Sequence, residues 1–134
     1  MPLQATLEEM AQSADHVLIG SVVGVDMLDS DGRPLTGDNE RTGPGLGNVI
    51  RLIIEVQTVL VSSAADVPKE IRVPLDPMMH YSLGQIRKAH NEPSESFLLL
   101  LKGPSFAPIL PGVFGRPMTE QEEAIRLYTK HHSN

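Results

Sequence analysis

The chain lacks cysteine and long apolar runs, and each shortage excludes a class of protein. With no cysteine at all, the fold cannot depend on disulfides, and the redox state of its compartment cannot be inferred from thiols. The longest apolar run, residues 97–101, has only the length of a strand, whereas a membrane-spanning helix needs about 18 apolar residues or more. The sequence therefore predicts no membrane span.

Aromatic residues and positive charge are also scarce, which argues against nucleic acid as a partner. The chain has 3 Phe, 2 Tyr and no Trp, so few side chains could stack on unpaired bases. Asp and Glu number 17 against 11 Lys and Arg, which gives a net charge of -6. Because this charge repels phosphate backbones and anionic lipids, the expected partner is a basic protein.

At 134 residues the chain has the length of a single domain, and we expect residues 1–134 to form one. Its first residues lack the basic start and apolar core of a signal peptide. Two interpretations follow. The protein is either cytoplasmic or the mature part of an exported, periplasmic protein whose leader was replaced by an initiator methionine.

Capping boxes predict a helix near each end of the chain. Thr6 and Glu9 can cap one another's backbone amides, and an apolar stripe follows, so we expect a helix over residues 6–14. The same spacing of Thr119 and Glu122 predicts a helix over residues 119–131 that ends in a frayed, solvated histidine tail.

Residues 16–114 read as the β core. A β-branched run interrupted by Gly20 and Gly24 predicts one long bent strand over 16–28, and alternating apolar residues predict another over 49–62. Shorter strands are expected at 70–75, 95–102 and 107–114, with Pro74 marking an edge or an end. The predicted fold is therefore mainly β with flanking helices, a five-stranded, OB-like, partly open barrel, and a small β-sandwich is the alternative.

Two long connections between strands are the candidate functional segments. Residues 29–48 are too polar to order themselves firmly by burial, and their acidic side chains either steer a basic partner or are simply solvated. Residues 76–94 hold one helical turn at 82–90 and side chains of the kinds that anchor protein interfaces; alternatively this segment folds back to cap the open end of the barrel. The candidate partner-binding residues are Met78, Met79, His80, Tyr81, Ser82, Arg87, Asp29, Asp31, Asp38 and Glu40.

No pattern indicates a catalytic centre, a metal site or a cofactor. The five histidines lack the spacing of zinc ligands, and residues 103–106 around Ser105 do not form a nucleophile elbow. The acidic pairs at 8–9 and 122–123 lie in first helical turns, where they complement the helix dipole. Residues 29–32 look like a calcium loop, but Met27 occupies its first ligand position. The protein is therefore expected not to be an enzyme.

The order of the segments resembles that of bacterial TIMP-like, or netrin-like, OB-fold domains. The resemblance is carried by residues 14–22 (ADHVLIGSV), 50–60, 69–73, 95–101 and 111–114. It implies a barrel fold and export from the cytoplasm. Family members that inhibit metalloproteases use an N-terminal cysteine to chelate the metal, and this chain, which has no cysteine, cannot work that way.

The size, the negative charge and residues 74–85 (PLDPMMHYSLGQ) are also similar to periplasmic immunity proteins that neutralise type VI secretion amidase effectors. This resemblance implies that a loop blocks the groove of a basic cysteine peptidase that cuts cell-wall peptides, and it leaves a homodimer open. The resulting hypothesis is a non-enzymatic inhibitor or immunity protein. Its alternatives are an envelope assembly domain that pairs through an edge strand and a small ligand-binding barrel.

Overall fold

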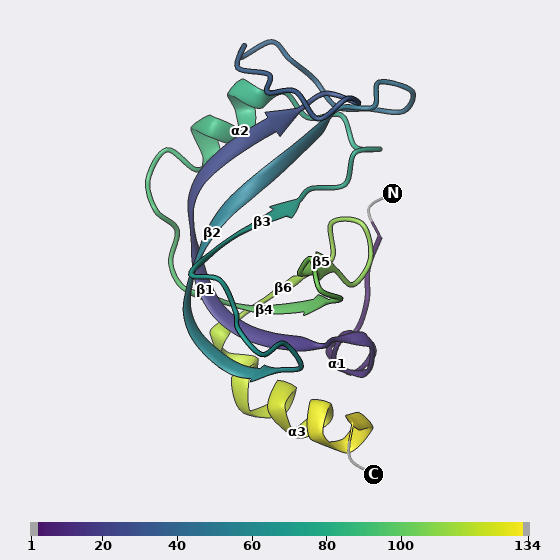
Figure 1. The fold of residues 1–134 in the computed structure, drawn as a ribbon, viewed down its shortest axis with the longest axis vertical. Coiled ribbons are helices and arrows are strands. Elements are labelled where there is room, and N and C mark those ends of the chain that lie inside the picture. Colours follow the sequence, from purple (N-terminus) through teal and green to yellow (C-terminus); the bar gives the residue numbers. More distant parts are fainter. Residues whose placement is uncertain (1–2, 133–134) are drawn as a thin grey trace.

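The strands of the computed structural model, which describes residues 3–132, form one antiparallel sheet that curls into a half-barrel (Figure 1). The sheet order is β3-β2-β1-β4-β5, and β6 also pairs with β4. The fold is therefore mainly β with an OB-like, partly open barrel, as predicted, and the two-sheet sandwich is not formed. The elements are α1 (Leu7–Ser13), β1 (His16–Leu28), β2 (Val49–Ser62), β3 (Glu70–Pro74), α2 (Leu83–Ala89), β4 (Phe97–Lys102), β5 (Ala107–Pro108), β6 (Gly115–Arg116) and α3 (Gln121–His132).

Two of the three irregularities in the β1–β2 pairing occur at the glycines of β1, as the sequence predicts. The pairing shifts register between Val17 and Leu18, between Ile19 and Gly20, and between Val22 and Gly24, which marks β-bulges. A Cβ atom at Gly20 would lie 2.6 Å from the carbonyl oxygen of Glu55, so only glycine allows this approach. Because β1 pairs with β4 only as far as Gly20, its second half leaves β4 and the barrel stays open.

The sheet buries apolar side chains on both of its faces. Leu98 and Leu100 of β4 pack with α1 and α3, whereas Leu99 and Leu101 face the concave side with Phe106 and other residues of a second cluster. All four leucines are fully buried, so β4 is covered on both faces. The helices thus close the outer face at one end, and the half-barrel folds around the inner cluster.

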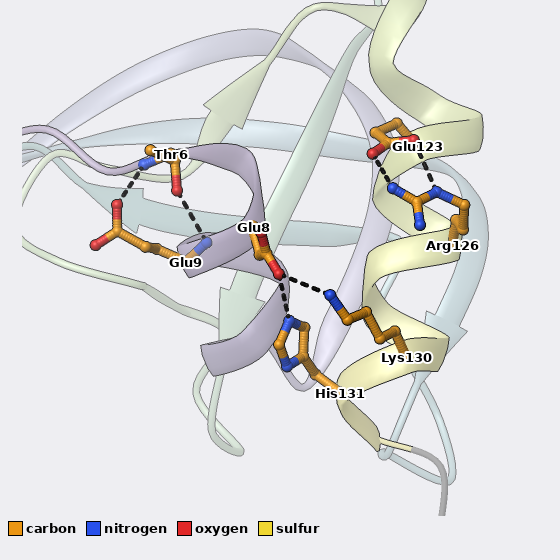
Figure 2. A network of polar contacts seen from close by, with 7 residues as sticks. All are labelled: Thr6, Glu8, Glu9, Glu123, Arg126, Lys130 and His131. Atoms are coloured by element: carbon orange, nitrogen blue, oxygen red, sulfur yellow. Dashed lines mark hydrogen bonds and ion pairs between the residues drawn. The ribbon is translucent and has the colours of Figure 1, made fainter.

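The predicted capping box of the first helix is present. Thr6 Oγ1 accepts a hydrogen bond from the Glu9 amide at 3.1 Å, and Glu9 Oε1 accepts one from the Thr6 amide at 3.0 Å (Figure 2). The local pattern therefore places the start of α1 correctly. Across residues 3–132, no helix combines the length and apolarity needed to cross a bilayer.

The predicted C-terminal helix is present, but its predicted capping box and its predicted frayed end are wrong. Residues 118–120 form a 3₁₀ turn with no side-chain cap, and α3 begins at Gln121. Beside this turn, Glu120 accepts two hydrogen bonds from the Arg116 guanidinium, at 2.8 and 3.0 Å. The two terminal histidines belong to α3 and contact α1 instead of fraying. His131 Nε2 lies 3.1 Å from Glu8 Oε1, and His132 Nε2 lies 3.1 Å from the carbonyl oxygen of Ala11.

The single strand predicted over residues 107–114 is also wrong. The chain forms two short strands, β5 and β6, separated by a tight turn in which the Val113 amide donates to the Leu110 carbonyl at 2.8 Å. Pro108 and Pro111 remove backbone donors from any longer ladder, and Gly112 has φ +76, which turns the chain. Phe114 nevertheless packs into the inner cluster.

Candidate partner-binding surface

The two long connections lie together at the end of the half-barrel opposite α1 and α3 (Figure 1). We call residues 29–48 and 76–87 the paired-loop end, because backbone hydrogen bonds join them: the Leu83 amide donates to Glu40 O at 2.8 Å and the Gly84 amide to Asp38 O at 3.0 Å. The acidic segment is therefore held by backbone bonds to the second loop, and the expectation that it would lack firm order is wrong. Backbone hydrogen bonds, and not apolar burial alone, can order a polar segment.

Thr42 joins the two loops from a buried position. Its side chain is 2% exposed, and its hydroxyl donates to the Met79 carbonyl at 2.7 Å and accepts from the Tyr81 amide at 3.2 Å. The Thr42 amide also donates to Tyr81 O at 2.9 Å. Thr42 is not predictable from the sequence as a functional residue, since a threonine in a polar loop carries no local signal of a partner far along the chain.

Most of the predicted acidic residues are engaged within their own loop or with α2. Asp29 Oδ1 accepts from the amides of Asp31 and Arg33, both at 2.9 Å, and the Arg33 amide bond is the main reason why the pKa of the Asp29 carboxyl lies below its usual value. Asp31 lies 2.8 Å from the Arg33 guanidinium. These two carboxylates therefore shape the turn and present little unpaired charge to a partner.

The other two acidic candidates, Asp38 and Glu40, differ in their side-chain contacts. Asp38 Oδ1 lies 3.1 Å from Arg87 Nη1, which also donates to Thr36 O at 2.7 Å, so Asp38 and Arg87 brace the acidic loop against α2. The Glu40 carboxylate makes no hydrogen bond or ion pair with residues 3–132. Of the four acidic candidates, Glu40 is the one whose side-chain charge is free for a partner.

The second loop contains residues of two kinds. Met78 is 60% exposed and His80 is exposed, so both side chains face solvent. Tyr81 is half-buried and packs against the cluster around Met27, and the Met79 backbone is tied to Thr42. Part of the loop therefore caps the barrel, and the rest faces solvent.

Ser82 has a structural role at the start of α2. Its hydroxyl accepts from the Gln85 amide at 3.2 Å, and Gln85 Oε1 accepts from the Ser82 amide at 3.3 Å, which confirms the predicted helical turn. An isolated β-bridge joins Ser82 to Arg41. Ser82 thus fixes where α2 begins and how the loops meet.

The structure also shows an apolar groove on the concave side of the sheet. Its volume is about 810 Å³, and Glu95 is the one carboxylate among lining residues that include no lysine or arginine. Val22, Leu52 and Phe114 form part of its wall. Within residues 3–132, no group of three or more His, Asp or Glu side chains is arranged to hold a metal ion, and no buried side-chain nitrogen or oxygen lacks a hydrogen-bond partner.

No family model matches the chain, and neither the curated proteins nor the solved structures contain a match to it. The similarities to TIMP-like domains and to immunity proteins therefore stay predictions.

Proposed function

We propose that the protein is a non-enzymatic binding module that presents the paired-loop end to a protein partner. The observation that carries the proposal is the buried Thr42 junction, which holds both loops in one conformation while Met78 and His80 point to solvent. A surface that is ordered before binding loses less conformational entropy when the complex forms. Methionine adapts to irregular partner surfaces, so Met78 suits a role as an anchor.

The consequence that we propose is inhibition of a basic cysteine amidase that cuts cell-wall peptides, by a periplasmic form of this protein. The net charge of -6 would speed the encounter with an enzyme that is basic because it binds an anionic polymer. The free Glu40 carboxylate lies on the same loop pair as Met78 and His80, and adds a charged contact for a Lys or Arg of the enzyme. The loop would enter or cover the substrate groove of the enzyme.

The proposal is tested with the cysteine amidases encoded in the genome that carries this gene, each purified and assayed on isolated cell wall. We expect one of them to be inhibited at a one-to-one ratio. The double variant Met78→Ala/His80→Ala should weaken binding by about thirtyfold or more, since anchor residues contribute about 2 kcal/mol or more. Calorimetric titration measures the affinity.

Val59→Ala is the matched control, because Val59 is 46% exposed and lies on β2 at the end of the barrel away from the paired loops. It should leave affinity unchanged. If none of the amidases binds, inhibition of this enzyme class is wrong; if one binds and the double variant binds it equally well, the paired-loop end is the wrong surface.

The apolar groove supports a second candidate function, a small ligand-binding barrel. Its volume of about 810 Å³ lies within the range of ligand pockets, which is about 300–1,000 Å³. Assembly through the edge strand has less support. β3 does lie at the edge of the sheet, but it is short and carries Glu70, Arg72 and Pro74, features that blunt edge pairing. Sedimentation analysis would detect self-association through β3.

A further inference from the structure

Three arginines line one pocket beside the paired-loop end. Arg51 comes from β2, Arg72 from β3 and Arg87 from α2, and the pocket has a volume of about 450 Å³. Residues 25–28 and 34–36 complete its wall, and Asp26 is the one carboxylate among the lining residues. The pocket therefore brings together three guanidinium groups from three separate elements.

Asp26 orients two of the three guanidinium groups. It lies directly opposite Arg51 in the β1–β2 register, and Arg51 donates to its two oxygens from Nε at 2.8 Å and from Nη2 at 2.6 Å. Arg72 Nε donates to Asp26 Oδ2 at 3.2 Å. One carboxylate thus holds two guanidinium groups in place, and Glu70 and Asp38 supply further carboxylates to Arg72 and Arg87.

The other contacts of these arginines still leave donors unused. Arg72 Nη2 lies 3.2 Å from Glu70, and Arg87 Nη1 donates to Thr36 O and to Asp38. Arg51 Nη1, Arg72 Nη1, and Arg87 Nε and Nη2 make no hydrogen bond with residues 3–132. The guanidinium groups are fixed on one side by protein acceptors and keep N–H groups available on the other.

Their exposure suits a binding site. The side chains are 27% exposed for Arg51, 42% for Arg72 and 39% for Arg87. Each guanidinium is therefore partly shielded from water, which strengthens its charge-assisted hydrogen bonds, and each remains accessible to a ligand. Planar guanidinium forks match the paired oxygens of phosphate and carboxylate groups.

We infer that the pocket binds an oxyanion group, phosphate or carboxylate, of a small ligand. The oxygens of the group would accept from the unused N–H donors of Arg51, Arg72 and Arg87. The pocket of about 450 Å³ also has room for a body beyond the oxyanion, since ligand sites span about 300–1,000 Å³. This inference does not depend on the proposed function: the pocket shares Arg87 and residues 34–36 with the paired-loop end, but its ligand is of another class and does not need the exposed Met78 and His80.

The test is a titration of the whole chain, followed by amide NMR shifts, with inorganic phosphate in one arm and citrate in the other. Sodium chloride keeps the ionic strength constant, so that general screening does not contribute. We expect saturable shifts at Thr36, Arg51, Arg72 and Arg87 with a Kd of about 1 mM or tighter in at least one arm. Arg72→Gln should raise that Kd by about tenfold or more, and the arm that saturates identifies the oxyanion.

Arg126→Gln is the matched control, because it makes the same change in net charge at an ion pair with Glu123 on α3, away from the pocket. It should leave the Kd unchanged. Arg72 is 42% exposed, and an unchanged unfolding midpoint for Arg72→Gln would show that the variant is folded. Shifts that stay linear in both arms, or an equal loss of affinity in Arg126→Gln, would overturn the inference.

Discussion

At the scale of single residues, His16 links three parts of the barrel from a fully buried position. It is 1% exposed, its Nε2 lies 2.8 Å from the carbonyl oxygen of Gly103 and its Nδ1 lies 2.7 Å from Ser62 Oγ. A carbonyl oxygen can only accept, so Nε2 carries the proton. In the neutral ring Nδ1 then accepts from Ser62 Oγ, which itself accepts from the Ala64 amide at 3.0 Å.

Replacing His16 by phenylalanine should therefore destabilise the fold, even though ring volume is retained. His16→Phe leaves the Gly103 carbonyl and the Ser62 hydroxyl without their partner, and buried polar groups left unpaired cost about 1–3 kcal/mol. Urea unfolding followed by circular dichroism measures the loss. His80→Phe, at an exposed position, is the control and should unfold like the parent; equal stability of His16→Phe would contradict a structural role for its hydrogen bonds.

At the scale of secondary-structure elements, Glu8 ties α1 to α3. Its Oε1 lies 3.1 Å from Lys130 Nζ and 3.1 Å from His131 Nε2 (Figure 2). The hydrogen bond from Lys130 is the first reason why the pKa of the Glu8 carboxyl lies below its usual value, and the hydrogen bond from His131 is the second. Folding therefore favours the ionised carboxylate.

This pKa shift predicts a pH-dependent contribution to stability. Because the folded pKa is depressed, the contribution is complete above the unfolded value of about 4.3 and disappears as the pH falls through the folded value. Glu8→Gln should therefore lower the melting temperature at pH 7 in low salt, and the difference should shrink as the pH falls below the unfolded pKa or as the salt concentration is raised to about 1 M. Scanning calorimetry measures both.

The control for Glu8→Gln is Glu122→Gln, which removes a carboxylate that makes no hydrogen bond or ion pair with residues 3–132. It should change the melting temperature much less at pH 7. A Glu8→Gln difference that persists at low pH would mean that the substitution disturbs α1 itself and that the ion pairs contribute nothing.

At the scale of the whole molecule, the sequence predicts features that depend on neighbours along the chain. The predicted capping box of Thr6 involves residues three positions apart, and the bend at Gly20 follows from the glycine itself. The box expected between Thr119 and Glu122 has the same spacing, but it does not form, because residues 118–120 adopt a 3₁₀ turn that has no side-chain cap. A local pattern therefore predicts the structure only where the backbone around it takes the expected conformation.

The sequence predicts which segments form the candidate surface, but not how these segments contact one another. Long polar connections can be recognised from composition, but the contact of Thr42 with Tyr81 spans 39 positions and that of Arg72 with Asp26 spans 46. Which residues meet depends on the register of β1, β2 and β3. A one-residue change of register would move Asp26 to the other face of the sheet relative to its partners. Neither the loop junction nor the arginine pocket could therefore be predicted without the tertiary structure.

The loop junction allows a final prediction about how stability is distributed through the molecule. Thr42→Val keeps the shape of the side chain and the backbone bond to Tyr81 O, but it leaves the Met79 carbonyl and the Tyr81 amide without the hydroxyl, at a cost of about 1–3 kcal/mol. Since β4 lies outside these contacts, the paired loops should open locally while the barrel stays folded. Hydrogen exchange should become faster at Tyr81, Leu83 and Gly84, and the amides of residues 98–101 should keep their protection.

Thr36→Val, at an exposed position of the same loop, is the control and should change the exchange of neither set of amides. Faster exchange in β4 as well would mean that the loops and the barrel unfold as one unit, and that the ordered surface is inseparable from the core that supports it.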